Sequence, residues 1–403
     1  MTPPDRIVTL DVVRGLAVLG ILLLNIIDFA LPRCAAVDPT CYRASTADWW
    51  TWATVFVLAD GKMRGLFTML FGASAVLVAE QASRRGRSPS RIHYARMATL
   101  LPIGMAHGWL IWSGDILVLY AVAGMLLYPA LVLPARKLLA IAAILALLGF
   151  ASAVVTHHAA ARFALEAQAP DASAETRAQW RRFVSALRPP PEAIAAEIRQ
   201  QRGGWAEVLP ARIERTAEAQ ASIPLLLGET IALMLIGVAL FRSGFFTGTW
   251  SRRRYWQVIA LGYGVAVPLY VPLVLWMDAA RFDPIALLLS DPIHLFVLRP
   301  PVALAHAAAA ILLVRGMRAP WLVARLAAVG RMALSNYVGA SIIGTWLFCG
   351  YGLGWFGALA RWQLYLIVPL IWLAMLGASP AWLRRFAQGP LEGVWRRLAR
   401  LLA

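Results

Sequence analysis

The feature that most constrains this chain is a series of ten apolar stretches, several of which contain ionisable residues. About 20 apolar residues cross a bilayer as a helix, and hydrophobic residues make up 60% of the 403 positions. No stretch alternates with the period of two that a membrane β-barrel requires. We therefore predict an all-α fold, a polytopic membrane bundle of about ten transmembrane helices. The predicted spans are 16–31, 63–79, 97–111, 116–133, 138–155, 223–241, 256–277, 293–314, 326–348 and 363–376.

The distribution of basic residues predicts the orientation in the membrane. The formal net charge is +17, but the arginines concentrate in alternate loops, which favours membrane topology over a nucleic-acid partner. Loops rich in arginine and lysine face the cytoplasm, so both termini are expected there, in a multi-pass protein of the bacterial inner membrane. The clusters that share one side lie at 84–96, 136–137, 242–254, 315–325 and 384–400.

The chain is expected to be a single membrane domain, residues 1–403. Its longest extramembrane piece, residues 158–222, is predicted to be a large periplasmic helical loop between the fifth and sixth spans. This loop is interpreted either as a solvated connector or as a cap over an outward cavity. Cys34 and Cys41 share the first outer loop, where a disulfide and two free thiols both fit the sequence.

Ionisable residues inside the spans are the candidates for function, because a charge in hydrocarbon costs several kcal/mol and usually faces a protein interior or a wet cavity. We predict that those in the outer half meet around one solvated chamber that opens to the periplasm. The alternative is that each is structural: a hydrogen-bonded core histidine, or an ion pair at a helix end such as Asp11 with Arg14. The outer-half residues are Asp28, Asp60, Lys62, Arg64, His107, Asp115, Glu229 and Arg299.

Helical rise gives approximate depths for these residues. His107 is expected roughly two helical turns below Asp115, which sits at the outer turn between the third and fourth spans. Asp60 suits a helix N-cap or first turn, where a carboxylate meets unpaired N–H groups. No spacing typical of metal ligands, phosphate-binding loops or serine nucleophiles occurs in the sequence, so no metal site is predicted.

The order of several short motifs resembles that of the YeiB-like bacterial membrane proteins, over nearly the whole chain. The motifs are Leu10-Asp11-Val-Val-Arg14-Gly15 with Asn25, Asp60-Gly-Lys62-Met-Arg64-Gly-Leu-Phe67 with Phe71-Gly72, His107 with Gly114-Asp115-Ile-Leu and Tyr120, Gly330-Arg331-Met-Ala-Leu-Ser-Asn336-Tyr337, Gly350-Tyr-Gly-Leu-Gly354, and Gly389-Pro390-Leu391-Glu392. Each motif is weak alone, and the ordered set is specific.

That family looks distantly related to transmembrane acyltransferases, including heparan-alpha-glucosaminide N-acetyltransferase and the sugar O-acyltransferases. The resemblance implies transfer of an acyl group from a cytoplasmic thioester donor, such as acyl-CoA, to an extracytoplasmic small-molecule, lipid or glycan acceptor. The glucosaminide enzyme carries its catalytic histidine between the first two helices, whereas no histidine occurs here from Asn25 to Asp60. His107 would then take its place.

On this hypothesis His107 is the general base, oriented by Asp115 or Asp60. Asn25 or Arg299 stabilises the oxyanion. The remaining candidates divide into acceptor-binding residues, namely Asp28, Lys62, Arg64, Glu229 and Arg299, and donor-binding residues, namely Asp11, Arg14, Arg331 and Asn336.

Two other functions fit the same residues. A transporter or exporter of a small molecule or lipid would use the acids and His107 as a proton relay. A non-catalytic membrane protein would instead dock another protein on its outer loop. The sequence specifies neither the substrate nor the oligomeric state.

Overall fold

The computed structural model describes residues 7–316 and 319–403, and their fold is all-helical, with 82% helix and no strand. This confirms the predicted helical polytopic bundle. The helices are α1 (Val8–Ala30), α2 (Thr46–Leu58), α3 (Lys62–Arg84), α4 (Pro89–Ala106), α5 (Leu117–Leu127), α6 (Ala135–Gln168), α7 (Ala174–Leu187), α8 (Pro191–Gln201), α9 (Trp205–Ala221), α10 (Ile223–Arg242), α11 (Arg252–Ile259), α12 (Val267–Ala279), α13 (Pro284–Pro292), α14 (Arg299–Arg315), α15 (Pro320–Arg331), α16 (Ala333–Phe348), α17 (Arg361–Arg385) and α18 (Pro390–Leu402). Short 3₁₀ segments are η1 (Arg33–Ala36) and η3 (Tyr128–Val132), and π-helical segments are η2 (His107–Ile111), η4 (Ala260–Ala266) and η5 (Ile293–Leu298).

Among the described residues, seven helical segments are long and apolar enough to cross a membrane, or eight if α15 and α16 together count as one span. The predicted count of about ten is therefore not confirmed. The difference lies in the predicted spans 97–111 and 116–133. The first corresponds to α4 and η2, and α4 carries Arg91, His93 and Arg96; the second corresponds to α5 and η3, of which α5 has only 11 residues. The chain is a multi-pass helical membrane protein.

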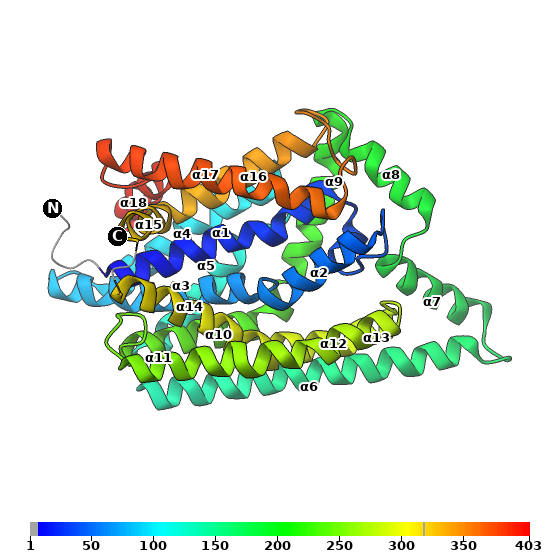
Figure 1. The fold of residues 1–403 in the computed structure, drawn as a ribbon, viewed down its shortest axis with the longest axis horizontal. Helices are drawn as coiled ribbons and strands as arrows, with labels where there is room; N and C mark the ends of the chain where they lie inside the picture. Colours follow the sequence, from blue (N-terminus) through cyan, green and yellow to red (C-terminus); the bar gives the residue numbers. More distant parts are fainter. Residues whose placement is uncertain (1–6, 317–318) are drawn as a thin grey trace.

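The start of α1 and the C-terminal helix α18 lie at one end of the bundle, and α7 and α8 lie at the other (Figure 1). We call these the terminal end and the cap end. Helix α1 runs through the middle of the bundle, with 16 of its 23 residues buried. The predicted cytoplasmic position of the terminal end is not tested by the fold. Residues 317–318, within the basic cluster at 315–325, lie outside the described residues.

Helices α7, α8 and α9 form the cap, which lies within the predicted loop 158–222; the first residues of that predicted loop instead continue α6 as far as Gln168. Ion pairs attach it to the loop after α1: Arg188 contacts Asp38 at 3.2 Å, and Glu218 contacts Arg33 at 2.9 Å. That loop also contains a disulfide between Cys34 and Cys41. Helix α9 reaches furthest into the bundle, where the Thr216 hydroxyl donates to the carbonyl of Gly108 at 2.8 Å. The cap therefore covers η2 from the cap end.

The chain bends by 82° between α15 and α16, and a side chain from α18 closes this break. The Glu392 carboxylate is buried and accepts hydrogen bonds from the backbone N–H groups of Leu334 at 2.8 Å and Ser335 at 3.1 Å, and from the Ser335 hydroxyl. First-turn N–H groups have no partner within their own helix, so Glu392 caps α16 from a separate helix. Helix α18 is thereby fixed to the bundle.

Replacing Glu392 with alanine is expected to destabilise the α16 start, because several buried donors lose their acceptor. The expected loss is about 1–3 kcal/mol of unfolding free energy, read from denaturant unfolding in detergent. Amide hydrogen exchange should accelerate at Leu334 and Ser335. The matched control is Glu80→Ala on α3, whose exposed carboxylate pairs only with Arg84 at 3.8 Å; equal losses in the two variants would contradict a capping role.

Candidate functional site

The first candidate site is a buried pair, His107 and Asp115, which we call the dyad. His107 Nδ1 and Asp115 Oδ1 are 2.8 Å apart, and both side chains are at most 4% exposed. The other carboxylate oxygen accepts the backbone N–H of Val118 at 2.8 Å, so Asp115 also caps the start of α5. This second bond fixes the carboxylate, and the carboxylate in turn orients the imidazole ring.

The second ring nitrogen of the dyad has no partner. His107 Nε2 is buried and makes no hydrogen bond to any described residue. The ring lies 5.1 Å from that of Tyr337 and 6.2 Å from that of Trp112, measured between centroids. Trp112 donates its indole N–H to Asp28 at 2.8 Å, which places Asp28 beside the dyad on the α1 side.

The depth expected for His107 was wrong, although the pairing with Asp115 was one of the two predicted. Helical rise put about two turns between the residues, on the assumption of a continuous helix. Instead η2 ends at Ile111, Trp112 is extended, and the chain reverses before α5 begins. The reversal returns Asp115 to the level of His107. Asp60, the other predicted partner, lies at the start of α3 next to Gly61, in a different cluster.

A cavity of about 1000 Å³ opens at the terminal end, between α1, α3, α4, α16 and α18. Its lining includes Arg85 near its mouth and Phe67 at its inner part, which are separated along α3 by a rise of roughly 27 Å. The basic residues of the lining are Arg14, Arg85, Arg87, Arg96, Arg331, Arg396 and Arg400. Among the described residues, two acidic side chains, Asp11 and Glu392, accompany these arginines in the lining. The cavity is thus strongly cationic at its mouth.

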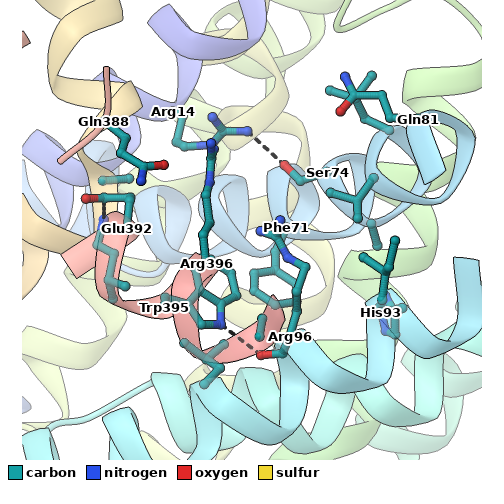
Figure 2. A pocket seen from close by; sticks show the side chains of 18 of the residues that line it. Arg14, Phe71, Ser74, Gln81, His93, Arg96, Gln388, Glu392, Trp395 and Arg396 are labelled. Atoms are coloured by element: carbon teal, nitrogen blue, oxygen red, sulfur yellow. Dashed lines mark hydrogen bonds between the residues drawn. The ribbon is translucent and has the colours of Figure 1, made fainter. Parts of the chain in front are cut away.

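Hydrogen bonds hold several of these side chains in place (Figure 2). Arg14 donates to Ser74 at 2.8 Å and pairs with Asp11 at 3.1 Å. Trp395 donates its indole N–H to the carbonyl of Arg96 at 2.8 Å, and the Arg96 guanidinium lies 4.3 Å from the centroid of the Trp395 ring. Helix α18 therefore forms one wall of the cavity.

The inner part of the cavity is apolar and ends at two tyrosines. Tyr120 and Tyr337 line it together with Phe67 and Phe71. Both tyrosine hydroxyls are already engaged: Tyr120 with Thr68 at 2.5 Å, and Tyr337 with the carbonyl of Gly114 at 3.2 Å. Because the Tyr337 ring contacts His107, a single residue touches both the cavity and the dyad.

A second buried group contains Arg64, Glu229 and Arg299, which we call the arginine–glutamate cluster. Glu229 Oε2 is 3.0 Å from Arg64, and Glu229 Oε1 accepts a hydrogen bond from Arg299. The cluster joins α3, α10 and α14. Lys62 is close by in α3, completely buried, with its amine donating to the carbonyl of Phe56 and lying 4.0 Å from the Tyr270 ring centroid.

The remaining predicted residues have separate places. Asp11, Arg14 and Arg331 line the cavity, as a donor site requires. Asn336 instead donates to Val329 O at 3.1 Å and Ser379 Oγ at 3.0 Å, so it bridges the helix break to α17. Asn25 is half-buried in α1, and its side chain makes no hydrogen bond within residues 7–316 and 319–403.

The predicted single chamber is divided in the structure. Asp28, His107 and Asp115 form one group, whereas Lys62, Arg64, Glu229 and Arg299 form another around α3. Within the described residues no hydrogen bond joins His107 to Asn25 or Arg299, the two residues considered for the oxyanion role. The cavity of about 1000 Å³ opens at the terminal end, and a chamber at the cap end stays a prediction.

Sequence reasoning did not select several residues of the site. Tyr337 stands in the motif that begins at Gly330, but its role depends on a contact between α16 and η2. Trp395, Arg396 and Glu392 belong to an amphipathic C-terminal segment. That amphipathic pattern could have predicted a helix that packs over a polar surface.

Comparisons with known proteins find one family model and bacterial relatives that match nearly the whole chain. Residues 240–401 match a family described as "Protein of unknown function (DUF418)". The chain is 34% identical over 401 residues to the uncharacterized protein YeiB of Escherichia coli (strain K12), covering 98% of this chain and 96% of that protein. It is 26% identical to the uncharacterized protein YxaH of Bacillus subtilis (strain 168), covering 97% and 94%. No solved structure matches the chain.

Proposed function

The chain belongs to the YeiB-like family of DUF418 proteins, and from the geometry of its buried groups we propose that it is a transmembrane acyltransferase. The acyl donor is a thioester with a phosphorylated carrier, such as acyl-CoA, bound in the terminal-end cavity. The acceptor is a small molecule, lipid or glycan with a hydroxyl or amine, which reaches the dyad from the cap end when α9 moves away from η2. We place the protein in the bacterial inner membrane with its terminal end in the cytoplasm.

The observation that carries the proposal is the contact of Tyr337 with both the cavity and His107. A donor bound in the cavity would have its charged part among the arginines and its acyl end against the tyrosine rings. Planar guanidinium groups bind phosphate oxygens in a bidentate manner. The unpartnered Nε2 of His107 lies on the other side of Tyr337.

The dyad is arranged for general base catalysis. With its Nδ1 proton donated to Asp115, the neutral imidazole has a free basic Nε2. Nε2 takes the proton of the acceptor O–H or N–H as that atom attacks the thioester carbonyl. The C–S bond then breaks, and the proton passes to the departing thiolate. The products are the acylated acceptor and the free thiol of the carrier.

The donor site is tested by binding and by thiol release in the purified full chain in lipid nanodiscs. We expect acyl-CoA to bind and to release free thiol when hydroxyl and amine acceptors are supplied. Arg396→Gln should weaken binding about tenfold through loss of a charged hydrogen bond. Arg397→Gln is the matched control, because Arg397 lies on the same helix but does not line the cavity.

Two results would remove this proposal. One is wild-type protein that neither binds acyl-CoA nor releases thiol with any acceptor. The other is an equal loss of affinity in Arg396→Gln and Arg397→Gln, which would place the binding outside the cavity.

Transport is the second candidate, and the helix break favours it. Discontinuous helices near the bilayer midplane commonly form the binding sites of transporters, and four residues of the α15–α16 break line the cavity: Gly330, Arg331, Ala333 and Leu334. Proteoliposomes distinguish the two functions. Movement of an anionic amphiphile across the membrane without covalent change supports transport, whereas an acylated acceptor supports transfer.

A further inference from the structure

The start of α3 is a helix end buried inside the bundle. Gly61 occupies the N-cap position with φ +65°, and no side chain caps the helix. Asp60, for which the sequence favoured a capping role, precedes the cap without filling it. The N–H groups of Lys62 and Met63 already donate to the carbonyl of Ala59, so this end offers an anion the positive end of the helix macrodipole. A helix start alone does not make a site, and the neighbouring side chains decide.

Arg299 places unpartnered donors against this first turn. Its side chain is 1% exposed, yet Nε and Nη1 make no hydrogen bond within the described chain. A β-carbon placed on Gly61 would lie 3.2 Å from Nη1, and one placed on Gly65 would lie 3.8 Å from Nε. The guanidinium therefore lies along the turn that begins α3. Buried N–H groups without acceptors cost about 1–3 kcal/mol each.

The carboxylates around this turn leave two donors of Arg299 unpaired. Lys62, Arg64 and Arg299 are three cationic side chains close to Asp60 and Glu229, and Asp291 lies near Asp60. Glu229 is already shared by both arginines. The His294 ring lies near the same turn, with its Nδ1 engaged with Tyr270 at 3.0 Å, but its Nε2 makes no hydrogen bond to Arg299 within the described chain. An anionic acceptor at this place would satisfy the buried donors of Arg299.

The group has a route to solvent. The Arg64 side chain is 26% exposed, whereas Glu229 is 9% and Arg299 is 1% exposed. Solvent therefore reaches the cluster from the Arg64 side. A small anion arriving there would meet Arg64 first and the unpartnered donors of Arg299 behind it.

We propose that one anionic group, a carboxylate or a phosphate ester, binds beside the first turn of α3, with Arg299 Nε and Nη1 and the buried Lys62 amine as its donors. The site lies apart from the terminal-end cavity and from the dyad. Binding at this site does not depend on acyl transfer. The chain would therefore bind a second, anionic ligand in addition to the proposed acyl donor.

Calorimetry with inorganic phosphate and with acetate tests the proposal in the full chain, in nanodiscs of neutral lipid. The background carries Arg14→Gln and Arg396→Gln, so that the cavity does not contribute. We expect saturable binding of at least one probe, weakened about tenfold by Arg299→Gln. Phosphate alone would identify a phosphate-ester ligand, and acetate alone a carboxylate ligand. Arg325→Gln should change nothing, because Arg325 is an exposed residue of α15 that donates to Leu376 O.

A second variant keeps the test decisive if Arg299→Gln does not fold. Gly65→Ala fits the fold, because its β-carbon would meet Leu233 at 3.7 Å and Arg299 Nε at 3.8 Å, both ordinary contacts. The added methyl group occupies the space beside the free N–H, so binding should weaken while the unfolding midpoint is kept. Absence of saturable binding for both probes would overturn the proposal. Unchanged affinity in both Gly65→Ala and Arg299→Gln would also overturn it. If Arg299→Gln does not fold, unchanged affinity in Gly65→Ala is sufficient to overturn it. Because no acyl donor is present, these outcomes are independent of the proposed enzyme activity.

Discussion

Replacement of His107 with glutamine is expected to lower acyl transfer by about 10²–10⁴-fold, the usual contribution of a positioned general base. Glutamine can still donate a hydrogen bond to Asp115 but has no basic nitrogen at the position of Nε2. Because His107 does not line the cavity, the affinity for the donor should remain at the wild-type value. The measurement is the rate of thiol release, with donor binding determined on the same preparation.

The control for this substitution is His158→Gln, which changes an exposed histidine at the cap end of α6. It should leave both the rate and the affinity unchanged. Asp115→Asn provides a further check, since an amide can retain the Val118 N–H bond but weakens the orientation of the imidazole; its rate should fall while binding persists. Wild-type turnover in His107→Gln would exclude this histidine as the base and leave the cavity without an adjacent catalytic group.

The sequence predicted the fold class well because the physical signal is local. Long apolar runs must form helices in a membrane, where each backbone N–H and C=O needs a partner within the segment. The same local signal does not determine the number of spans, because a short or interrupted apolar run can either cross the membrane or remain on one side. Helix α4 carries Arg91, His93 and Arg96 in its first half, and the apolar stretch after Gly114 is interrupted by η3, so length and hydropathy do not decide whether each stretch crosses the membrane.

The arrangement of the site depended on contacts that no local pattern specifies. The His107–Asp115 bond required the chain to reverse directly after a π-helical turn, and the Tyr337 contact required α16 to pack beside that turn. Ionisable residues were recognised individually from the cost of burying charge. Their division into a dyad and an arginine–glutamate cluster follows from which helices adjoin, and Glu229 on α10 meets Arg299 on α14 only in the folded chain.

The position of the cavity also could not be predicted from local sequence patterns. Polar residues inside spans favoured a chamber at the cap end, but among them Glu229 is shared by Arg64 and Arg299, and two donors of Arg299 keep no acceptor within the described chain. The open volume lies where like charges gather without enough carboxylates to neutralise them, around Arg14, Arg96 and Arg396. The loops that indicated topology therefore also supply much of the candidate donor site, which is a consequence of the fold bringing α18 back against α4.

Substitution of Gly237 by alanine is expected to cost about 3 kcal/mol or more of unfolding free energy, from overpacking between two backbones. A β-carbon on Gly237 would lie 1.9 Å from the carbonyl oxygen of Met69, and one on Gly72 would lie 2.1 Å from that of Met234. The two glycines thus let α3 and α10 approach closely, as small residues do between membrane helices. Since α3 carries Arg64 and α10 carries Glu229, this approach also sets the distance within the arginine–glutamate cluster.

The matched control for Gly237→Ala lies on the same helix. A β-carbon on Gly228 would meet no atom within 4 Å, so Gly228→Ala should be neutral or stabilising by up to about 1 kcal/mol through helix propensity. Unfolding by denaturant titration in one detergent compares the two variants directly. Equal stability would mean that α3 and α10 are further apart than the structure places them, and the Arg64–Glu229 ion pair would then lose its geometric basis. A large difference would confirm the close crossing on which that pair depends.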